Sequence, residues 1–163
     1  MDKMKKKAIV PLISLISSLI IIGCSSDKEN QANQIEVPEV ITVNINVPEQ
    51  VDIHEEVRLS TSVYQGEEAV DDAREVIFEV WKNEERENGT LVEGEWTEDG
   101  LYEIDYTFED DGIYILQTHV TARDMHVMPK KMIIAGEVPN EDIEAFLKSG
   151  GPSNDTEESL HHH

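Results

Sequence analysis

Residues 101–120 read LYEIDYTFEDDGIYILQTHV, and this stretch decides the fold class of the chain. Two runs of alternating side chains flank the turn pair Asp111-Gly112. The alternating positions are Tyr102, Ile104, Tyr106 and Phe108 in the first run and Tyr114, Leu116, Thr118 and Val120 in the second. A period of two that is rich in aromatic and β-branched residues is typical of strands with one covered face. Each run therefore predicts one half-buried strand.

Similar runs lie on both sides of this stretch. They occupy residues 41–45, 57–63, 76–80 and 131–135. Turn signals separate the runs at short intervals, at Gln65-Gly66, Asn88-Gly89 and Asp99-Gly100. Short strands at this spacing, with no helical pattern between them, indicate an all-β sandwich. We therefore predict one antiparallel β-sandwich domain over residues 39–136.

The turn before the second of the quoted runs contains a structural motif. Asp110, Gly112 and Tyr114 resemble the D-x-G-x-Y-x-C corner of immunoglobulin-like domains, with Leu116 at the position of the disulfide cysteine. In such a corner the tyrosine hydroxyl donates a hydrogen bond to the backbone a few residues upstream. The resemblance implies an immunoglobulin-like sandwich in which Tyr114 has a structural role.

The first 24 residues have the parts of a bacterial export signal. Four lysines form a basic start, residues 8–22 are an apolar stretch, and Gly23 is the small residue before the cleavage point. Ile21-Ile22-Gly23-Cys24 resembles the lipobox of bacterial lipoproteins, which implies cleavage before Cys24 and attachment of lipid to its sulfur. Two or more acyl chains such as palmitate hold a protein firmly on a bilayer, because each buried CH₂ contributes about 0.8 kcal/mol.

An uncleaved membrane anchor is the alternative, because the apolar stretch is only slightly shorter than the ~18–20 residues of a spanning helix. Three serines and Pro11 dilute the stretch, and the only cysteine of the chain follows it directly, which favours the lipoprotein. We expect residues 1–23 to be a signal peptide and residues 24–38 to be a polar, flexible tether that begins at acylated Cys24. The mature protein is then expected on the extracytoplasmic face of the cell membrane.

The chain is strongly acidic, with 13 Lys and Arg against 35 Asp and Glu and a formal charge of −22. Loss of residues 1–23 removes four lysines and one aspartate and makes the charge −25. Such a surface repels nucleic acid and anionic lipid headgroups, because binding to either depends on Lys and Arg at phosphate. We interpret the acidity as keeping a tethered domain soluble, with capture of cations as the alternative.

Residues 137–163 are predicted to be an acidic tail with one short helix. A helix over residues 140–149 is indicated by a cap at Asn140, an apolar stripe from Ile143 to Leu147 and a terminator at Gly150. A helix of this length is marginal by itself. The end of the tail is expected to be disordered, and the histidines at 161–163 are either native or the remnant of a tag.

Few residues of the predicted domain could carry catalysis. Apart from the terminal three, the histidines are His54, His119 and His126, and there is no Gly-rich phosphate loop. The acidic pairs at 71–72 and 110–111 lack the spacing of a calcium loop. We therefore predict that the protein is not an enzyme.

One segment combines soft metal ligands. Residues 119–128 contain His119, Met125, His126 and Met128. Imidazole and thioether suit Cu(I), and methionine binds a metal without losing a proton. His126-Val127-Met128 has the H-x-M form of extracytoplasmic copper chaperones of the PCuA(C) type, although three residues also match by chance. The alternative is that Met125 and Met128 close one end of the sandwich while His126 faces solvent.

Strand alternation limits how these side chains can meet. If Tyr114, Leu116 and Val120 face the core, His119 points to the opposite face of the sheet. His119 then reaches His126 and Met128 only if the following loop folds back over that side or the end of the strand twists. Sequence alone leaves these possibilities open.

The same segment also carries a family resemblance. Residues 119–129 (HVTARDMHVMP), together with residues 75–82 (EVIFEVWK) and the Asp-Gly-x-Tyr corner, resemble the YtkA-like lipoproteins of Bacillus and related Gram-positive bacteria over residues 38–136. The resemblance implies a small immunoglobulin-like sandwich on a lipid anchor. It also implies a relationship to FixH-like proteins, which are associated with copper supply to respiratory oxidases.

On this analogy we expect a monomeric, membrane-anchored protein that binds or carries Cu(I) through His126 and Met128, with Met125 and His119 as additional ligands. The expected partners are proteins of respiratory oxidase assembly or copper transport. Two other interpretations stay open. One is a protein-interaction module of the cell envelope that uses the Met-containing loop as its recognition surface. The other is a sensor lipoprotein whose acidic face detects cations.

Overall fold

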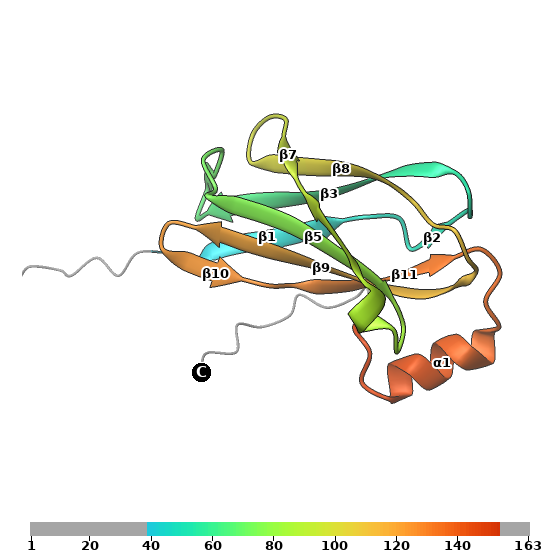
Figure 1. Cartoon of the computed structure of the whole chain (residues 1–163). Coiled ribbons are helices and arrows are strands. Elements are labelled where there is room, and N and C mark those ends of the chain that lie inside the picture. Colours follow the sequence, from blue (N-terminus) through green and yellow to red (C-terminus); the bar gives the residue numbers. More distant parts are fainter. Residues whose placement is uncertain (1–38, 154–163) are drawn as a thin grey trace, which may run out of the picture. The chain divides into compact units, whose positions relative to one another are not determined.

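The computed structural model describes residues 39–153 of the chain. Their strands form two β-sheets. The predicted signal peptide, Cys24, the tether up to residue 38 and the tail from residue 154 lie outside the described residues. The first sheet is named here the β3 sheet and the second the β9 sheet, after their central strands. Figure 1 shows the two sheets as stacked layers.

The β3 sheet has the order β1-β3-β8-β7, with β4 paired to β3. Its strands are β1 (Ile41–Asn46), β3 (Glu56–Gln65), β4 (Glu68–Ala69), β7 (Glu95–Trp96) and β8 (Leu101–Thr107). The β9 sheet has the order β2-β11-β9-β5-β6, with β10 paired to β9. Its strands are β2 (Gln50–Val51), β5 (Glu75–Lys82), β6 (Thr90–Glu93), β9 (Gly112–Ala122), β10 (Met125–Val127) and β11 (Lys130–Ala135). All pairs are antiparallel except β2 with β11, which is parallel.

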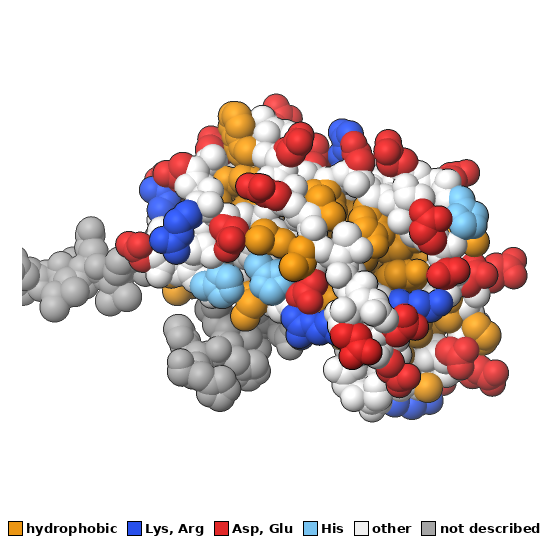
Figure 2. Space-filling model, viewed as in Figure 1, with side chains coloured by type: hydrophobic (Ala, Val, Ile, Leu, Met, Phe, Trp, Pro, Cys, Tyr) orange, Lys and Arg blue, Asp and Glu red, His pale blue; other side chains and the backbone are white. Residues whose placement is uncertain are grey.

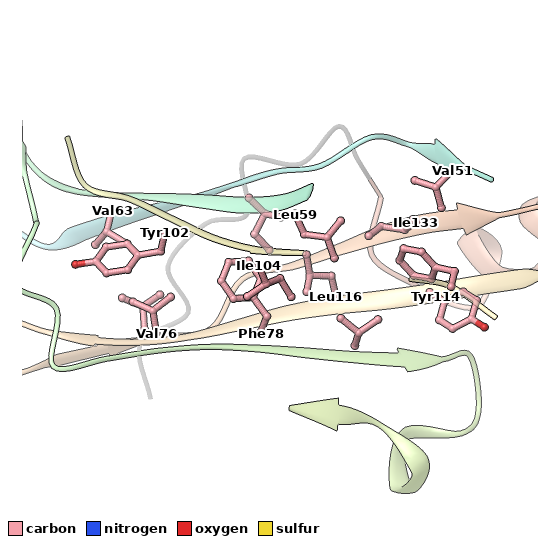
Figure 3. Packing of buried hydrophobic residues seen from close by; sticks show 14 of the residues in the cluster. Val51, Leu59, Val63, Val76, Phe78, Tyr102, Ile104, Tyr114, Leu116 and Ile133 are labelled. Carbon is pink, nitrogen blue, oxygen red and sulfur yellow. The ribbon is translucent and has the colours of Figure 1, made fainter. Parts of the chain in front are cut away.

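The alternating residues of the sequence form the core between the sheets. Leu59 and Val63 of β3, Phe78 of β5, Leu116 of β9 and Ile133 of β11 are all fully buried there. Figure 3 shows these side chains projecting from both layers into the space between them. The prediction of an all-β, immunoglobulin-like sandwich is therefore confirmed.

The connection from β8 to β9 passes from one sheet to the other at the Asp-Gly-x-Tyr corner. The Tyr114 hydroxyl donates a hydrogen bond of 3.1 Å to the backbone carbonyl of Asp110. The ring of Tyr114 packs edge to face on Phe108, with centroids 4.9 Å apart. Gly112 begins β9 immediately after this corner. This hydrogen bond is the one that the resemblance to immunoglobulin-like domains implies.

Helix α1 (Asn140–Lys148) lies on the outer face of the β9 sheet, on the side away from the β3 sheet (Figure 1). Phe146 is buried, and Ile143 and Val138 pack beside it. Beneath them lie Trp81, Ile113, Ile115 and Met132. The helix begins at Asn140, but the predicted side-chain cap by this residue is not formed. Packing against the sheet, and not a cap, is what stabilises so short a helix.

Within residues 39–153, no helix is long and apolar enough to cross a bilayer.

Candidate metal centre

Strands β9, β10 and β11 form one long hairpin that carries all four candidate ligands. The paired residues are Met125 with Ala122, Val127 with Val120 and, after two unpaired positions, Lys130 with Gln117. Strands β10 and β11 therefore pair with β9 in the same register, and they are one strand that is interrupted at Met128 and Pro129. Pro129 has no N–H to donate. Its carbonyl still accepts a hydrogen bond of 3.2 Å from the backbone N–H of Thr118.

This register places three of the candidate ligands on the outer face of the β9 sheet. His126 pairs with Thr121, and the unchanged register puts Met128 opposite His119. Alternate residues of a strand share a face, so His119, His126 and Met128 lie together. The ring centroids of His119 and His126 are 6.3 Å apart. Figure 2 shows two histidine side chains next to each other on the face in view. Of the two routes by which His119 could reach His126 and Met128, the structure has the first, because the chain after β9 folds back along it as a hairpin.

Met125 lies on the opposite face of the same strand. It pairs with Ala122, a buried core residue, and packs with Val127 against the core. Its thioether is therefore separated from both imidazoles by the sheet, and we do not include it in the ligand set. Met128, in contrast, is 48% exposed. The alternative prediction was that both methionines close one end of the sandwich. Met125 does pack against the core, but Met128 does not.

The turn between β9 and β10 consists of Arg123 and Asp124, whose φ angles are +50° and +61°. Two successive residues with positive φ are the geometry of a type I′ hairpin turn, which Asn-Gly usually forms. Arg123 contacts Glu68 at 3.3 Å and Asp72 at 3.2 Å, which fixes its side chain. Arg-Asp is not a turn signal, so the sequence pattern predicts a loop after β9, whereas the structure has a hairpin with the short strand β10.

A carboxylate holds the ring of His119. His119 Nε2 lies 2.8 Å from Glu79 Oε2, which projects from the neighbouring strand β5. Arg86, in the 3₁₀ helix η1 (Arg86–Asn88), donates hydrogen bonds of 2.9 and 2.8 Å to the two oxygens of the same carboxylate. Arg86 foremost, and then His119, lowers the pKa of Glu79 to about 2. Glu79 is therefore ionised at neutral pH and acts only as an acceptor.

The hydrogen bond to Glu79 fixes which nitrogen of His119 is free. A neutral imidazole carries one N–H, and an ionised carboxylate accepts it. With Nε2–H directed at Glu79, the lone pair of Nδ1 remains for a metal. Metal-binding histidines commonly have such a carboxylate on the far ring nitrogen.

His126 is held in a similar way. Its Nδ1 lies 2.9 Å from the hydroxyl of Thr121, and that hydroxyl lies 3.5 Å from Glu75 Oε2. The hydroxyl has one proton, and when it donates this proton to Glu75, Nδ1–H of His126 donates to Thr121. Nε2 of His126 then has the free lone pair.

In these tautomers the outer face carries two imidazole nitrogens with a free lone pair, together with the exposed thioether of Met128. This donor set suits a soft ion such as Cu(I), which accepts low coordination numbers. Among residues 39–153, no three side chains of His, Cys, Asp or Glu gather into a metal-binding group. A metal site here therefore depends on the sulfur of Met128.

Several residues that shape this face were not singled out from the sequence. Glu79, Arg86, Gln117 and Thr121 all contact a candidate ligand or its carboxylate. The alternation in residues 75–82 could have placed Glu79 on the outer face of its strand. The pairing of β5 with β9, which brings Glu79 to His119, has no signal in a single sequence.

A model of the YtkA-like family matches residues 35–119. The match runs from before β1 to His119 in β9, so His126 and Met128 follow it in the chain. No curated protein matches the sequence.

Several solved structures are similar in fold. The superoxide reductase (neelaredoxin) from Ignicoccus hospitalis is 16% identical over 58% of this chain and 80% of that chain, with a TM-score of 0.42. The PmoD soluble domain from Methylocystis is 9% identical over 60% of this chain and 92% of that chain, with a TM-score of 0.42. The PKD domain of an M14-like peptidase from a Thermoplasmatales archaeon is 9% identical over 61% and 96%, with a TM-score of 0.37.

Proposed function

The chain belongs to the YtkA-like family, and from this premise we propose that it is a lipid-anchored extracytoplasmic protein that binds Cu(I) through His119, His126 and Met128. The observation that carries the proposal is the common register of β10 and β11, which places these three side chains on one face. Two nitrogens and one thioether satisfy Cu(I), whereas structural zinc takes four ligands of imidazole, thiolate or carboxylate type.

The proposed role is carriage of copper and not catalysis. The open position of the three ligands on a sheet face allows an incoming protein to approach the metal directly. A lipid on Cys24 would keep the carrier at the membrane, where respiratory oxidase assembly and copper transport proteins are the partners that fit. The lipobox in residues 21–24 supports this anchor.

The proposal is tested by titration of the mature chain with Cu(I) against a competing chelator under anaerobic conditions. The protein used for this titration is truncated after residue 160, because the histidines at 161–163 would bind copper themselves. We expect one Cu(I) per chain, and affinity at least tenfold weaker for His126→Ala and for Met128→Leu.

Met125→Leu is the matched control. The chemical change is the same as in Met128→Leu, but Met125 lies on the core face, so copper affinity should be unchanged. Absence of competition with the chelator contradicts copper binding. An equal loss in both methionine variants contradicts the proposed ligand set.

A protein-interaction module remains the second candidate. Met128 is 48% exposed and Leu91 of β6 is 65% exposed. Leu91 pairs with Glu79, so it belongs to the same outer face of the β9 sheet. Cross-linking to envelope proteins that persists in a chelator and in His126→Ala would favour this function over copper carriage.

A further inference from the structure

Behind the three proposed ligands lies a connected set of side chains that does not itself reach the metal position. We infer that Glu79 and Gln117, both held by Arg86, are positioning residues of the site: Glu79 fixes the ring of His119 with Nδ1 free, and Gln117 fixes the backbone of Met128. The inference rests on the proposed function and names what holds the ligands in place.

Arg86 joins the two positioning residues. Its guanidinium donates two hydrogen bonds to Glu79 and one of 2.9 Å to the side-chain oxygen of Gln117. The guanidinium also lies over the ring of Trp81, 4.7 Å from its centroid. Stacking on an aromatic ring and a bidentate carboxylate contact both need the planar group of arginine. Arg86 is therefore held in one orientation from two directions.

Gln117 links Arg86 to Met128, the second proposed ligand that this set of side chains supports. Its side chain is almost completely buried, with 4% exposure for the residue. Its amide nitrogen donates a hydrogen bond of 3.3 Å to the backbone carbonyl of Met128. Strand pairing is interrupted at Met128 and Pro129, so this side-chain bond fixes the backbone at the break. One guanidinium thus supports His119 through Glu79 and Met128 through Gln117.

The ion pair of Arg58 and Asp105 has the same chemistry as that of Arg86 and Glu79, but it lies away from the candidate ligands. Arg58 binds Asp105 with two hydrogen bonds of 2.9 and 3.2 Å on the β3 sheet. These two side chains are 62% and 44% exposed, and no candidate ligand touches them. Glu79, at 13% exposure, binds both an arginine and a histidine. The Arg58–Asp105 pair is therefore a control with the same chemistry outside the proposed site.

The first test reads the ring of His119 in the metal-free protein. Nitrogen–proton NMR correlation of the imidazoles at pH 8, above the ordinary histidine pKa of about 6.5, distinguishes the protonated nitrogen from the bare one. We expect Nε2–H alone at His119 in the wild type and in Arg58→Lys. In Glu79→Gln a fraction of Nδ1–H should appear. Nδ1–H as the main form in the wild type would overturn the inference.

The second test reads Cu(I) affinity by chelator competition in the same proteins. Loss of a residue that orients a metal ligand weakens metal binding by about 10–100-fold. We expect this loss in Glu79→Gln and in Arg86→Lys, which keeps the charge but not the planar fork. Gln117→Leu should weaken binding without changing the His119 ring. Arg58→Lys should bind as the wild type does.

The outcomes separate this inference from the function on which it rests. A wild type that binds no Cu(I) contradicts both the proposed function and the positioning role. Copper binding that is equal in the wild type, Glu79→Gln and Arg86→Lys overturns the positioning role alone. Circular dichroism and urea unfolding of each variant show whether the sandwich is intact, so that weaker binding is not a consequence of unfolding.

Discussion

Glu79 is the residue at which the stability of the fold should depend on acid. Arg86 and His119 lower its pKa from an ordinary value of 4.5 to about 2. A carboxyl group whose pKa is lower in the folded than in the unfolded chain stabilises the fold above the unfolded pKa, and this contribution is lost as pH falls through the folded pKa. We expect Glu79 to contribute stability at pH 6 and to lose this contribution between about pH 4.5 and about pH 2.

Urea unfolding of the wild type and Glu79→Gln at a series of pH values measures this contribution. The stability difference between the two proteins should be largest above pH 4.5 and should shrink towards pH 2. Comparison of the two proteins removes the effect of the other carboxyl groups, which titrate in both. A difference that does not change with pH would contradict the ion pair of Glu79 as its source.

The site shows, residue by residue, what a single sequence can predict. His119, His126 and Met128 could be named because imidazole and thioether are uncommon and occur here within ten residues. The separation of Met125 from Met128 could not be predicted, since it depends on strand register. Glu79 could not be assigned for a similar reason, because it is 40 residues away from His119 in the chain and meets it only through the pairing of two strands.

At the level of elements, helix α1 should detach when its anchor is removed. Phe146 is the buried residue of the helix and belongs to the same buried hydrophobic cluster as Trp81. Burial of one phenylalanine contributes about 1.5–3 kcal/mol, and a helix of nine residues has little stability of its own. In Phe146→Ala we therefore expect faster amide exchange in α1 and tryptophan fluorescence shifted to longer wavelength.

The fluorescence change should come from Trp81, which is 8% exposed in the folded protein, because Trp96 is already 52% exposed. Leu147→Ala is the control, since Leu147 lies on the same helix but is 39% exposed. An equal shift in both variants would show that helix propensity, and not the contact of Phe146, holds α1 in place.

The elements differ in how well the sequence predicts them. The long strands β3, β5, β8 and β9 were predictable, because each buries one face in the core and therefore alternates. Strand β10 was not, because its turn uses Arg123 and Asp124 in a conformation that usually requires asparagine and glycine. The apolar stripe of helix α1 predicts the helix itself, but not the surface on which it packs. Ile113 and Ile115 of β9 form part of that surface, and they alternate with core residues at positions where the strand pattern predicts an exposed side chain.

At the level of the whole molecule, Cys24 should decide where the protein is found. With the lipobox intact we expect the mature chain in the membrane fraction and a fatty-acylated N-terminal peptide by mass spectrometry. Cys24→Ser should remove the lipid, because serine has no thiol to form the thioether. The variant should then be released from the membrane or retained with an uncleaved signal. Ser25→Ala is the control and should behave as the wild type, and membrane association of Cys24→Ser after signal cleavage would contradict lipid anchoring.

The unbroken register of β10 and β11 restricts how the protein can evolve. Along this strand successive side chains alternate between the core and the outer face. Insertion of one residue after Asp124 would turn His126 and Met128 into the core and bring Met125 and Val127 out to solvent. Substitution of an outward-facing side chain here should therefore disturb the sandwich less than a change in the length of the strand. Changes of length in this hairpin are expected only in pairs of residues, or together with a compensating bulge.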